Sequence, residues 1–468
     1  MSNKNCADKI RKTLGPEKVF TDEFTLKDRR RDFWMMSALD DLQGRRVPNP
    51  ACVVKPKETK DVVEVVNLCR ENATPLITFG LGSGVCGGIR ATGNSVLLDM
   101  SSMTQTRLFD IDNLLVTFEA GVRGADAEAA VAKRGMTIGH YPQSIDVSSV
   151  GGWVATRSSG QFSTGYGNVE NVVLGLEAVL PDGSIINTRL VPRASTGPDL
   201  KQLLIGSEGT LGVITAVTFG LRWKAEKTIM KAYYAPTMEA GFDFQRFIIQ
   251  SGWQPAVMRQ YDASEVARLF ADFVRGDDAL ILLVHEGPAS YADAQSAACA
   301  AAASAQGCPE APEAAVQHWF EERNNVTNFD DLAGAGIVAD TIEISATWDR
   351  IASIYHNVVR AMKEVDEVAV SSGHSSHCYR SGINIYFTFA ARPENKERMA
   401  YIYNECWSRA MRCTIEGGGT ISHHHGIGRV RSRWLPEELG DGGLSLLKSI
   451  KKSLDPANFM NPGVLIND

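Results

Sequence analysis

The amino-acid sequence predicts an α+β protein of two domains, the second an α/β cap. Three observations support this prediction: the length of 468 residues, a block of short apolar runs at 112–220, and strand–helix alternation that begins near residue 223. A chain of this length exceeds one ordinary hydrophobic core. We therefore expect a first domain at 1–222, a cap or substrate domain at 223–420, and a segment at 421–468 that completes the first domain and its site.

The first domain is predicted to begin its regular structure with a helix and two buried strands. Apolar residues of 58–72 recur at i, i+3, i+4 and i+7, the spacing of one helix face. Residues 75–80 and 96–99 are short apolar runs typical of buried strands. In 112–220 the Val, Ile and Leu runs are separated by Gly, Pro and Ser, which predicts many short strands.

The second domain is predicted from alternating strand and helix patterns, which are typical of an α/β or α+β cap. The expected elements are strand 228–234, helix 238–250, strand 255–260, helix 263–274, strand 279–285, alanine-rich helix 289–305, strand 383–389 and helix 397–412. The glycines at 417–419 should end the last of these helices. A final helix is expected before Asp455 and Pro456.

The composition excludes several classes of protein. A net charge of -7 provides no general basic surface, which argues against nucleic-acid binding. The one basic cluster, Lys27 with Arg29–Arg31, is interrupted by Asp28 and is interpreted as a solvated helix face. The nine cysteines are odd in number and include no C-x-x-C pair, which disfavours a disulfide framework and fits a reducing compartment.

Targeting signals are not apparent in the sequence. The first residues contain no apolar signal region, the last residues match no peroxisomal signal, and no run of about 18 apolar residues could span a membrane. We therefore expect a cytoplasmic protein without a transmembrane segment.

A glycine-rich loop follows the strand at 75–80, with the sequence Gly80-Leu-Gly82-Ser83-Gly84-Val85-Cys-Gly-Gly88. A Rossmann turn would have to open a helix, but the next residues, CGGIRATGNS, are too rich in glycine for one. By itself the loop is explained equally well by a plain tight turn.

Two further segments, 142–167 and 206–212, are also rich in glycine and hydroxyl side chains. Together the three segments could donate backbone N–H and hydroxyl groups to one long ligand with a central pyrophosphate. Their order resembles the FAD domain of the vanillyl-alcohol oxidase and p-cresol methylhydroxylase family, from about residue 47 to residue 463.

This resemblance implies a two-domain p-cresol methylhydroxylase-type fold that binds FAD. The pyrophosphate would be held by Gly80, Gly82, Ser83, Gly84 and Val85. The adenine, ribose and isoalloxazine would be lined by Pro142, Ser148, Gly151, Gly152, Ser158, Gly160, Gly206, Glu208, Gly209 and Gly212. Because the first loop contains no histidine, we expect FAD bound without a covalent bond.

Three consecutive histidines, His423, His424 and His425, follow the predicted glycine stop. Histidine transfers protons and holds anions near neutral pH. A metal site is the alternative, although consecutive side chains on an extended loop point opposite ways, so at most two could share one ion. Tyr386, in the strand at 383–389, either packs in a core or contributes a reactive hydroxyl.

The segments 418–434, 149–157 and 195–199 resemble one branch of the family, the alkyldihydroxyacetonephosphate synthases. In that branch acyl is exchanged for alkyl on a glycerone-phosphate ester through a flavin N5 adduct. The resemblance implies that Tyr386 transfers a proton beside the histidine triplet and that Arg323 binds an anionic substrate group.

A neighbouring branch, the D-2-hydroxy acid dehydrogenases, binds a divalent metal through two histidines and a glutamate. This sequence has Tyr379, Tyr386 and His424 at those positions, which disfavours that metal site. His374 and His377 lie nearby and could form a different site or bind substrate.

We therefore predict a synthase-like FAD enzyme; the alternative is an FAD-linked oxidase or dehydrogenase of an alcohol or 2-hydroxy acid. The expected partners are an anionic small-molecule or lipid-like substrate and a second copy of the chain. No bound metal and no nucleic acid are expected, and peripheral membrane contact is compatible with this prediction.

Overall fold

The computed structural model describes residues 2–466, and its first two sheets lie in the N-terminal half of the chain. In the four-stranded sheet the order is β1-β2-β4-β3, with β2, β4 and β3 parallel. Its strands are β1 (Val19–Phe20), β2 (Cys52–Val54), β3 (Leu76–Phe79) and β4 (Val96–Asp99).

The second sheet has five antiparallel strands in the order β5-β6-β10-β8-β9. Its strands are β5 (Thr106–Asp110), β6 (Leu115–Glu119), β8 (Val173–Val179), β9 (Ile185–Asn187) and β10 (Val213–Gly220). The pair β7 (Met136–Thr137) and β11 (Arg222–Trp223) is separate. One hydrophobic core joins these sheets to helices α1 (Ser2–Leu14) and α4 (Thr59–Glu71).

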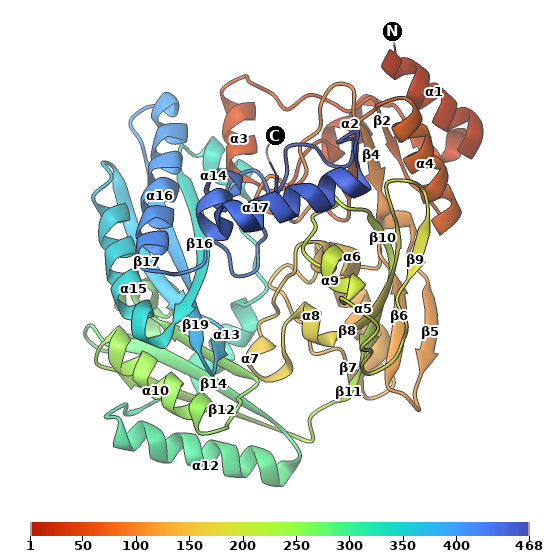
Figure 1. The fold of residues 1–468 in the computed structure, drawn as a ribbon. Helices are drawn as coiled ribbons and strands as arrows, with labels where there is room; N and C mark the ends of the chain where they lie inside the picture. Colours follow the sequence, from red (N-terminus) through yellow and green to blue (C-terminus); the bar gives the residue numbers. More distant parts are fainter. Residues whose placement is uncertain (1, 467–468) are drawn as a thin grey trace.

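The second half of the chain forms one eight-stranded sheet, seen behind helices α15 and α16 in Figure 1. Its strands are β12 (Lys227–Ala235), β13 (Val257–Tyr261), β14 (Ala279–Gly287), β15 (Glu310–Ala311), β16 (Val338–Thr347), β17 (Val368–Ser375), β18 (Cys378–Tyr379) and β19 (Gly382–Ala391). One face packs on four helices: α10 (Met238–Gln250), α12 (Ala289–Ala305), α15 (Trp348–Lys363) and α16 (Lys396–Glu416).

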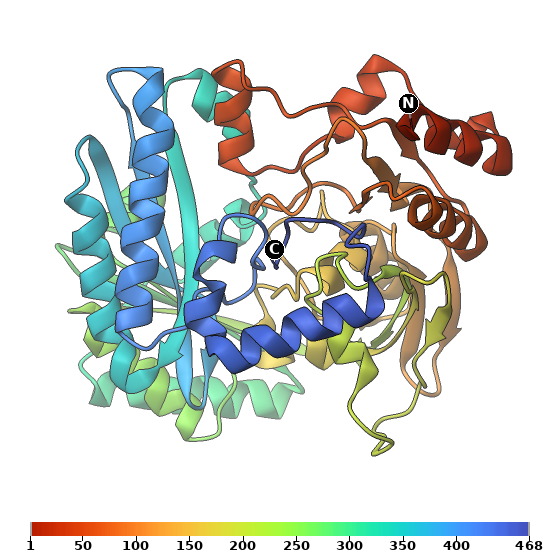
Figure 2. The same ribbon diagram turned by 45° about the horizontal axis from the view of Figure 1, so that its top comes forward.

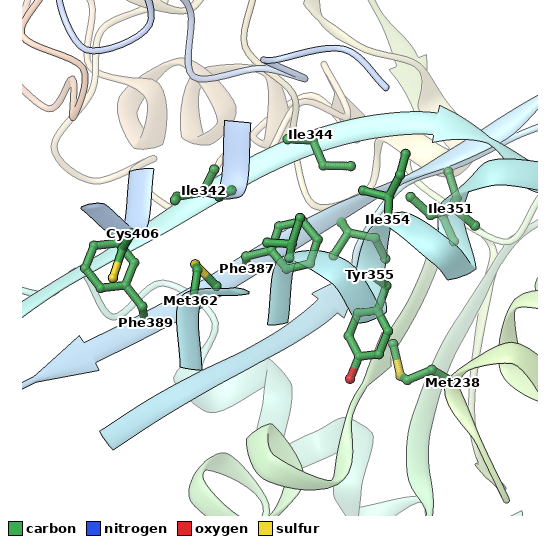
Figure 3. Close-up of a cluster of buried hydrophobic side chains, with 14 of the residues drawn as sticks. Met238, Ile342, Ile344, Ile351, Ile354, Tyr355, Met362, Phe387, Phe389 and Cys406 are labelled. Atoms are coloured by element: carbon green, nitrogen blue, oxygen red, sulfur yellow. The ribbon is translucent and has the colours of Figure 1, made fainter. Parts of the chain in front are cut away.

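Strands β16 and β19 direct one set of side chains into the core of this sheet (Figure 3). Ile342, Ile344 and Phe387 point into the core under the helices and are fully buried. Glu343 pairs with Tyr386 across the two strands. Because side chains of a strand alternate, Glu343 and Tyr386 both lie on the face away from these helices.

The two halves of the chain are joined by segments from both ends of the sequence. Helix α3 (Met35–Leu42), within the expected first domain, packs into the core of the eight-stranded sheet. Helix α17 (Leu435–Leu454) crosses between the halves in both views (Figures 1 and 2). Beyond it, the backbone of 459–461 bonds to Leu76 at the edge of β3.

The expected elements of the second half are present, and α10 and α12 have the predicted bounds. The helix expected at 263–274 is shorter than predicted, because α11 (Ala263–Leu269) ends at Leu269 and a 3-10 turn follows. Helix α16 ends where the glycines begin, as predicted. In the first half, the sequence pattern missed several short helices between the strands: α5 (Gly124–Ala132), α6 (Val150–Ala155), α7 (Ser163–Tyr166), α8 (Val169–Val172) and α9 (Leu200–Leu204). Most are shorter than two turns, too short to show a helical period. Among the described residues, no helix has the length and apolar content needed to cross a membrane.

The interpretation of the basic cluster as a solvated face is wrong. Arg29 Nε donates to Asp99 at 2.9 Å, and the guanidinium groups of Arg30 and Arg31 pair with Asp41. Arg30 is only 8% exposed. The pattern of charges could not show this, because the carboxylate partners lie beyond the cluster in sequence.

Candidate active site

The first glycine loop follows β3 and has free backbone donors. Within residues 2–466, no protein group accepts a hydrogen bond from the N–H groups of 81–84. Gly80 lies so near the second glycine segment that an added Cβ would be 2.5 Å from Ser149 Oγ. Free N–H groups on a loop that a ligand can approach closely suit a pyrophosphate.

The second glycine segment contains helix α6, and its glycines allow that helix to pack closely. Ser149 Oγ caps α6 by accepting a hydrogen bond from the Gly152 N–H at 3.2 Å. A Cβ on Gly151 would lie 2.8 Å from the carbonyl oxygen of Ala120, just past β6. The first and second segments therefore meet at Gly80, Ser149 and Gly152, although about 70 residues separate them.

The third segment contacts the C-terminal part of the chain through Glu208. Its carboxylate accepts hydrogen bonds from the N–H groups of Ile427 at 2.7 Å and Gly428 at 2.8 Å. The Asn461 amide donates to the Glu208 carbonyl at 2.8 Å. Burial raises the pKa of Glu208 to about 7. The Glu208 side chain is thus engaged by the protein, and it links segments 206–212 and 426–428.

The other predicted cofactor residues surround these contacts. Ser148 Oγ accepts from the Trp153 indole at 2.8 Å, and Ser158 Oγ lies 3.0 Å from His140 Nε2. A Cβ on Gly212 would lie 2.9 Å from the carbonyl of Val179, so this glycine packs against β8. The remaining positions lie in the same loops: Pro142, Gly160, Gly206 and Gly209. Their contacts with the cofactor stay predictions.

The residues around the three segments fit a dinucleotide with a pyrophosphate. Besides the free N–H groups of 81–84, the buried hydroxyl of Thr78 has no partner among the described residues and lies beside Gly209. His140 Nδ1 is also buried without a described partner. Buried polar atoms are normally hydrogen-bonded, so free donors and acceptors beside the glycine segments suit the hydrogen-bonding needs of such a ligand.

The histidine triplet lies on a loop after α16, as predicted. Two of its rings converge, although they were expected to point in opposite directions. His423 Nδ1 and His424 Nδ1 are 2.6 Å apart. The expectation of opposite directions assumed an extended backbone, whereas residues 423–425 form a bend. Burial lowers the pKa of His423 to about 4 and the pKa of His424 well below its ordinary value. Burial therefore favours the neutral form of both rings.

Tyr386 contacts the triplet directly. Its hydroxyl forms a hydrogen bond with His424 Nε2 and lies 3.3 Å from His425 Nε2. Burial raises the pKa of Tyr386, as does the negative charge of Glu343, while the positive charges of Arg259 and Arg431 oppose that rise. The structure thus brings together the tyrosine and the histidines that the sequence analysis paired.

A buried ion pair supports the triplet from behind. Glu343 and Arg431 are both fully buried and hydrogen-bonded to each other. Glu343 Oε1 accepts from the N–H groups of His424 at 3.2 Å and His425 at 2.8 Å. Arg431 donates to Cys86 Sγ in the first glycine loop at 2.9 Å. Burial would raise the pKa of Glu343, but Arg431 and the neighbouring His425 together outweigh it and hold that pKa well below the ordinary value.

His374 and His377 lie beside the triplet, but protein groups hold both rings. His374 Nδ1 is 2.8 Å from Glu265, and its ring stacks on Tyr386 with centroids 4.9 Å apart. His377 Nε2 donates to the Gly160 carbonyl at 2.8 Å, and its Nδ1 is 2.7 Å from Ser376 Oγ. The roles of His374 and His377 as substrate contacts stay predictions. Their bonds to protein groups suit a role in fixing the orientation of neighbouring side chains in the site.

The ring nitrogens of His377, His423 and His424 lie within 4.8 Å of one another, a spacing compatible with a metal ion. Only two of these three histidines belong to the triplet, which agrees with the expectation that at most two of its side chains could share one ion. Metal-ligating nitrogens must be unprotonated and free to coordinate. The His377 ring nitrogens both have protein partners, and the nearest nitrogens of His423 and His424 bond to each other.

Arg323 lies at the C-terminal end of helix α13 (Ala314–Glu322), above a group of aromatic rings. Its guanidinium donates to Gln161 Oε1 at 2.7 Å. Ring centroids lie 5.2 to 5.7 Å from its guanidinium carbon in Phe320, Phe162, Tyr141 and Trp319. Burial lowers the pKa of Arg323, and the charge of Arg259 lowers it further.

Arg259 is a functional candidate that the sequence analysis missed. It lies in β13, is 8% exposed, and its Nε donates to the Tyr261 hydroxyl at 2.8 Å. Among the described residues, neither Arg259 nor Arg323 forms an ion pair with a carboxylate. A buried cation without a counterion is costly, so the two guanidinium groups favour an anionic ligand. The sequence signal that could have identified Arg259 is a single arginine inside an otherwise uncharged strand.

Family comparison assigns both halves of the chain. Residues 50–189 match the FAD binding domain, and residues 225–465 match the C-terminal domain of FAD linked oxidases. Together the two matches cover the first two glycine segments, the histidine triplet and Tyr386, and the segment 206–212 lies between them.

Two curated relatives cover nearly the whole chain. The FAD-linked oxidoreductase YgcU of Escherichia coli K12 is 34% identical over 99% of each chain. Alkyldihydroxyacetonephosphate synthase of Caenorhabditis elegans is 30% identical over 91% of this chain and 78% of its own length.

Solved structures share the fold. An alkyldihydroxyacetonephosphate synthase has a TM-score of 0.80 at 21% identity, covering 98% of this chain and 84% of that chain. p-Cresol methylhydroxylase has a TM-score of 0.78 at 15% identity, covering 100% of this chain and 98% of that chain. The predicted two-domain p-cresol methylhydroxylase-type fold is therefore confirmed. The chain belongs to the FAD-linked oxidoreductases that join an FAD binding domain to the C-terminal domain of the FAD linked oxidases.

Proposed function

We propose that this FAD enzyme exchanges acyl for alkyl on a glycerone-phosphate ester, as an alkylglycerone-phosphate synthase-like transferase of ether-lipid synthesis. The observation that carries the proposal is the hydrogen bond between the Tyr386 hydroxyl and His424, in a site supported by Glu343 and Arg431. The identity with the synthase of Caenorhabditis elegans supports the same assignment.

Tyr386 and His424 are the residues proposed to handle the proton. A substrate proton next to a carbonyl group would pass to the Tyr386 oxygen, with His424 Nε2 accepting the proton that the tyrosine releases. Isolated tyrosine is a poor base at neutral pH, because its ordinary pKa is about 10. The direct contact between the two side chains compensates, since proton release to His424 avoids a free phenolate.

Arg259 and Arg323 are proposed to bind the anionic group of the substrate. Both are arginines without a carboxylate partner among the described residues, and both lie near the Trp319 ring, at 5.5 and 5.7 Å from its centroid. A guanidinium group binds phosphate through two parallel hydrogen bonds, which a lysine cannot form. Two such groups match the charge of a phosphate monoester.

FAD is proposed to bind without a covalent bond to the protein. When bound, it supplies the electron-accepting ring system for the reaction. The first glycine loop contains no histidine, and Cys86 accepts a hydrogen bond from Arg431 in a fully enclosed position. Burial raises the pKa of the Cys86 thiol well above its ordinary value, so the reactive thiolate is disfavoured.

Net oxidation of an alcohol or 2-hydroxy acid is the second candidate. It is supported by similarity to the glycolate oxidase subunit GlcD of Bacillus subtilis, which is 28% identical over 88% of each chain. The same tyrosine and histidine could take the hydroxyl proton of such a substrate.

Anaerobic mixing with two kinds of substrate, an acyl ester and a 2-hydroxy acid, distinguishes these candidates through the flavin spectrum. Palmitoyl-glycerone phosphate should alter the spectrum with release of palmitate, and hexadecanol should then restore the spectrum with no net reduction. Glycolate or D-lactate should leave the spectrum unchanged. Persistent bleaching with either hydroxy acid, and no palmitate release with the ester, would establish the oxidoreductase instead.

A further inference from the structure

Four side chains form an unbroken hydrogen-bonded chain through the candidate site. Tyr379 Oη lies 2.6 Å from His423 Nε2, and His423 Nδ1 lies 2.6 Å from His424 Nδ1. His424 Nε2 is in turn hydrogen-bonded to Tyr386 Oη. Each histidine uses one ring nitrogen toward one neighbour and the other nitrogen toward the next. We call these four residues the tyrosine–histidine chain.

The two ends of the tyrosine–histidine chain differ. At the inner end, Tyr386 is enclosed by His374 and the triplet, where the reaction is proposed to occur. At the outer end, the Tyr379 hydroxyl lies 3.1 Å from Asn168 Nδ2 and 3.4 Å from Asn168 Oδ1. Asn168 is half-buried and precedes α8. The chain thus leads from the candidate reaction centre to a residue that reaches solvent.

We propose that the tyrosine–histidine chain is a proton relay from Tyr386 to solvent at Asn168, and that Tyr379 is its outer proton carrier. The inference rests on the proposed proton transfer at Tyr386, and it applies to either candidate reaction. It assigns Tyr379, which has no role in the reactions considered above, to a positioning and transfer function for the proton.

The relay balances without leaving a charge on any member. A neutral imidazole carries one ring proton, so the hydrogen bonds of the chain have two consistent directions. Initially Tyr386 donates to His424, His424 donates to His423, and His423 donates to Tyr379. When the substrate proton bonds to Tyr386 Oη, each member passes its own proton outward, and the Tyr379 hydroxyl proton passes to water. The electron pair of the broken substrate bond stays on the substrate, and every hydrogen bond of the chain reverses direction.

The burial of the chain favours such a relay over stepwise charging. Burial lowers the pKa of His423 to about 4 and raises the pKa of Tyr379, so an imidazolium or a phenolate is costly at both positions. The pKa of Tyr386 is raised and the pKa of His424 is lowered by the same desolvation. A coordinated shift leaves all four residues neutral, which a buried site favours.

The first experiment examines the chain in the FAD-loaded enzyme without substrate. In protein labelled with ¹⁵N-histidine, His423 and His424 should each appear as a neutral single tautomer with a strongly deshielded ring proton. Tyr379→Phe should shift the His424 resonances as well as those of His423, because the bonds are contiguous. Tyr233→Phe is the matched control, since the Tyr233 hydroxyl is buried without a partner.

Unchanged His424 resonances in Tyr379→Phe would overturn the relay. Stoichiometric metal in the purified enzyme, bound to His377, His423 and His424, would overturn it as well. This spectrum needs no substrate, so a negative result is distinct from failure of the proposed reaction.

The second experiment measures turnover with whichever probe the wild-type enzyme accepts. Tyr379→Phe should lower kcat roughly 100-fold, the lower range for proton-transferring groups, with KM and flavin content unchanged. Rates of the wild type in mixtures of H2O and D2O should depend on deuterium content along a curve, as expected for several protons in flight. Tyr379→Phe should give a straight line. A straight-line dependence of the wild-type rate on deuterium content, or a normal kcat in Tyr379→Phe, would contradict the relay. Absence of turnover with every probe would contradict the proposed function alone.

Discussion

At the scale of single residues, the environment decides the chemistry of the site. Tyr386 and Tyr355 are both tyrosines on or beside the eight-stranded sheet, yet the Tyr355 hydroxyl donates to Asp262 while that of Tyr386 meets two histidines. Only the second arrangement places a hydroxyl against imidazole nitrogens, which can accept or donate a proton. Because both residues are tyrosines, only their hydrogen-bond partners distinguish them.

Removing the Tyr386 hydroxyl should stop proton transfer without unfolding the protein. Tyr386→Phe deletes one polar atom and little volume, so the variant should bind FAD normally. The chemical step should slow by roughly 100- to 10,000-fold, the usual range for general acid–base groups. Adding His424→Ala should cost far less than the product of the two separate losses, because the pair acts as a unit. Rapid-reaction measurements of the flavin signal provide the test, and near-normal turnover in Tyr386→Phe would return this residue to a packing role.

Replacing either buried arginine by lysine should weaken binding of an anionic substrate. Arg323→Lys and Arg259→Lys keep the charge but lose the planar donor geometry. A hydrogen bond to a charged group contributes about 1.5–3 kcal/mol, so the KM should rise by roughly 10- to 100-fold in each variant. Arg134→Lys is the control, because Arg134 stacks on Phe109 away from the site. Equal KM values in all three variants would show that the arginines were misassigned.

At the scale of elements, the site is assembled where a strand pair, a loop and a glycine turn meet. Strands β16 and β19 place Glu343 opposite Tyr386. Arg431 then connects Glu343 to Cys86 in the first glycine loop. The first glycine loop and the histidine loop are thereby held in one hydrogen-bonded network, so a change in the ion pair should affect both loops.

Neutralising the ion pair should destabilise the protein in a pH-dependent way. Glu343→Gln leaves Arg431 buried without its partner, which should cost about 3–5 kcal/mol at pH 7. The pKa of Glu343 is depressed in the folded state, so its contribution to stability is present above its ordinary value of 4.5 and is lost as the pH falls through the folded pKa. Urea unfolding of wild type and variant should therefore differ most near neutral pH and converge in acid.

The control for this prediction is Glu310→Gln, which breaks an exposed ion pair with Lys231. Exposed pairs contribute little, so its unfolding curve should stay close to that of the wild type. A Glu343→Gln protein as stable as the control at pH 7 would contradict a structural role for the buried pair.

At the scale of the whole molecule, both halves contribute residues to the proposed cofactor site. The glycine segments come from the first half, the tyrosine and histidines from the second, and residues 455–466 return to β3. A ligand that binds only this folded arrangement stabilises it by mass action. FAD should therefore act on the stability of both halves together.

Acid precipitation should release the flavin from the protein. Because the first glycine loop lacks a histidine and Cys86 is buried, the supernatant should be yellow and the washed pellet colourless. Readdition of FAD to flavin-free protein should raise the unfolding temperature of one cooperative transition. Colour retained in the pellet would show covalent attachment, and two separate transitions would show that the halves unfold independently.

By itself, the sequence determined the local elements and the inventory of the site. In the second half, alanine-rich composition places α12 and a period-2 pattern places β19. The glycine loops and the histidine triplet are visible as runs of adjacent residues. These features depend only on residues that are close together along the chain, so a single sequence is enough to predict them.

Only the tertiary structure decided which distant residues meet. The convergence of His423 on His424 depends on a bend in the backbone. The pairing of Arg431 with Glu343 spans 88 residues. The position of Arg259 over the Trp319 ring depends on how β13 faces α13. Buried charges acquire their partners and their pKa values from such contacts, which no local pattern records. The tyrosine–histidine chain is of the same kind, because Tyr379 and His423 are neighbours in space and separated by 44 positions in sequence.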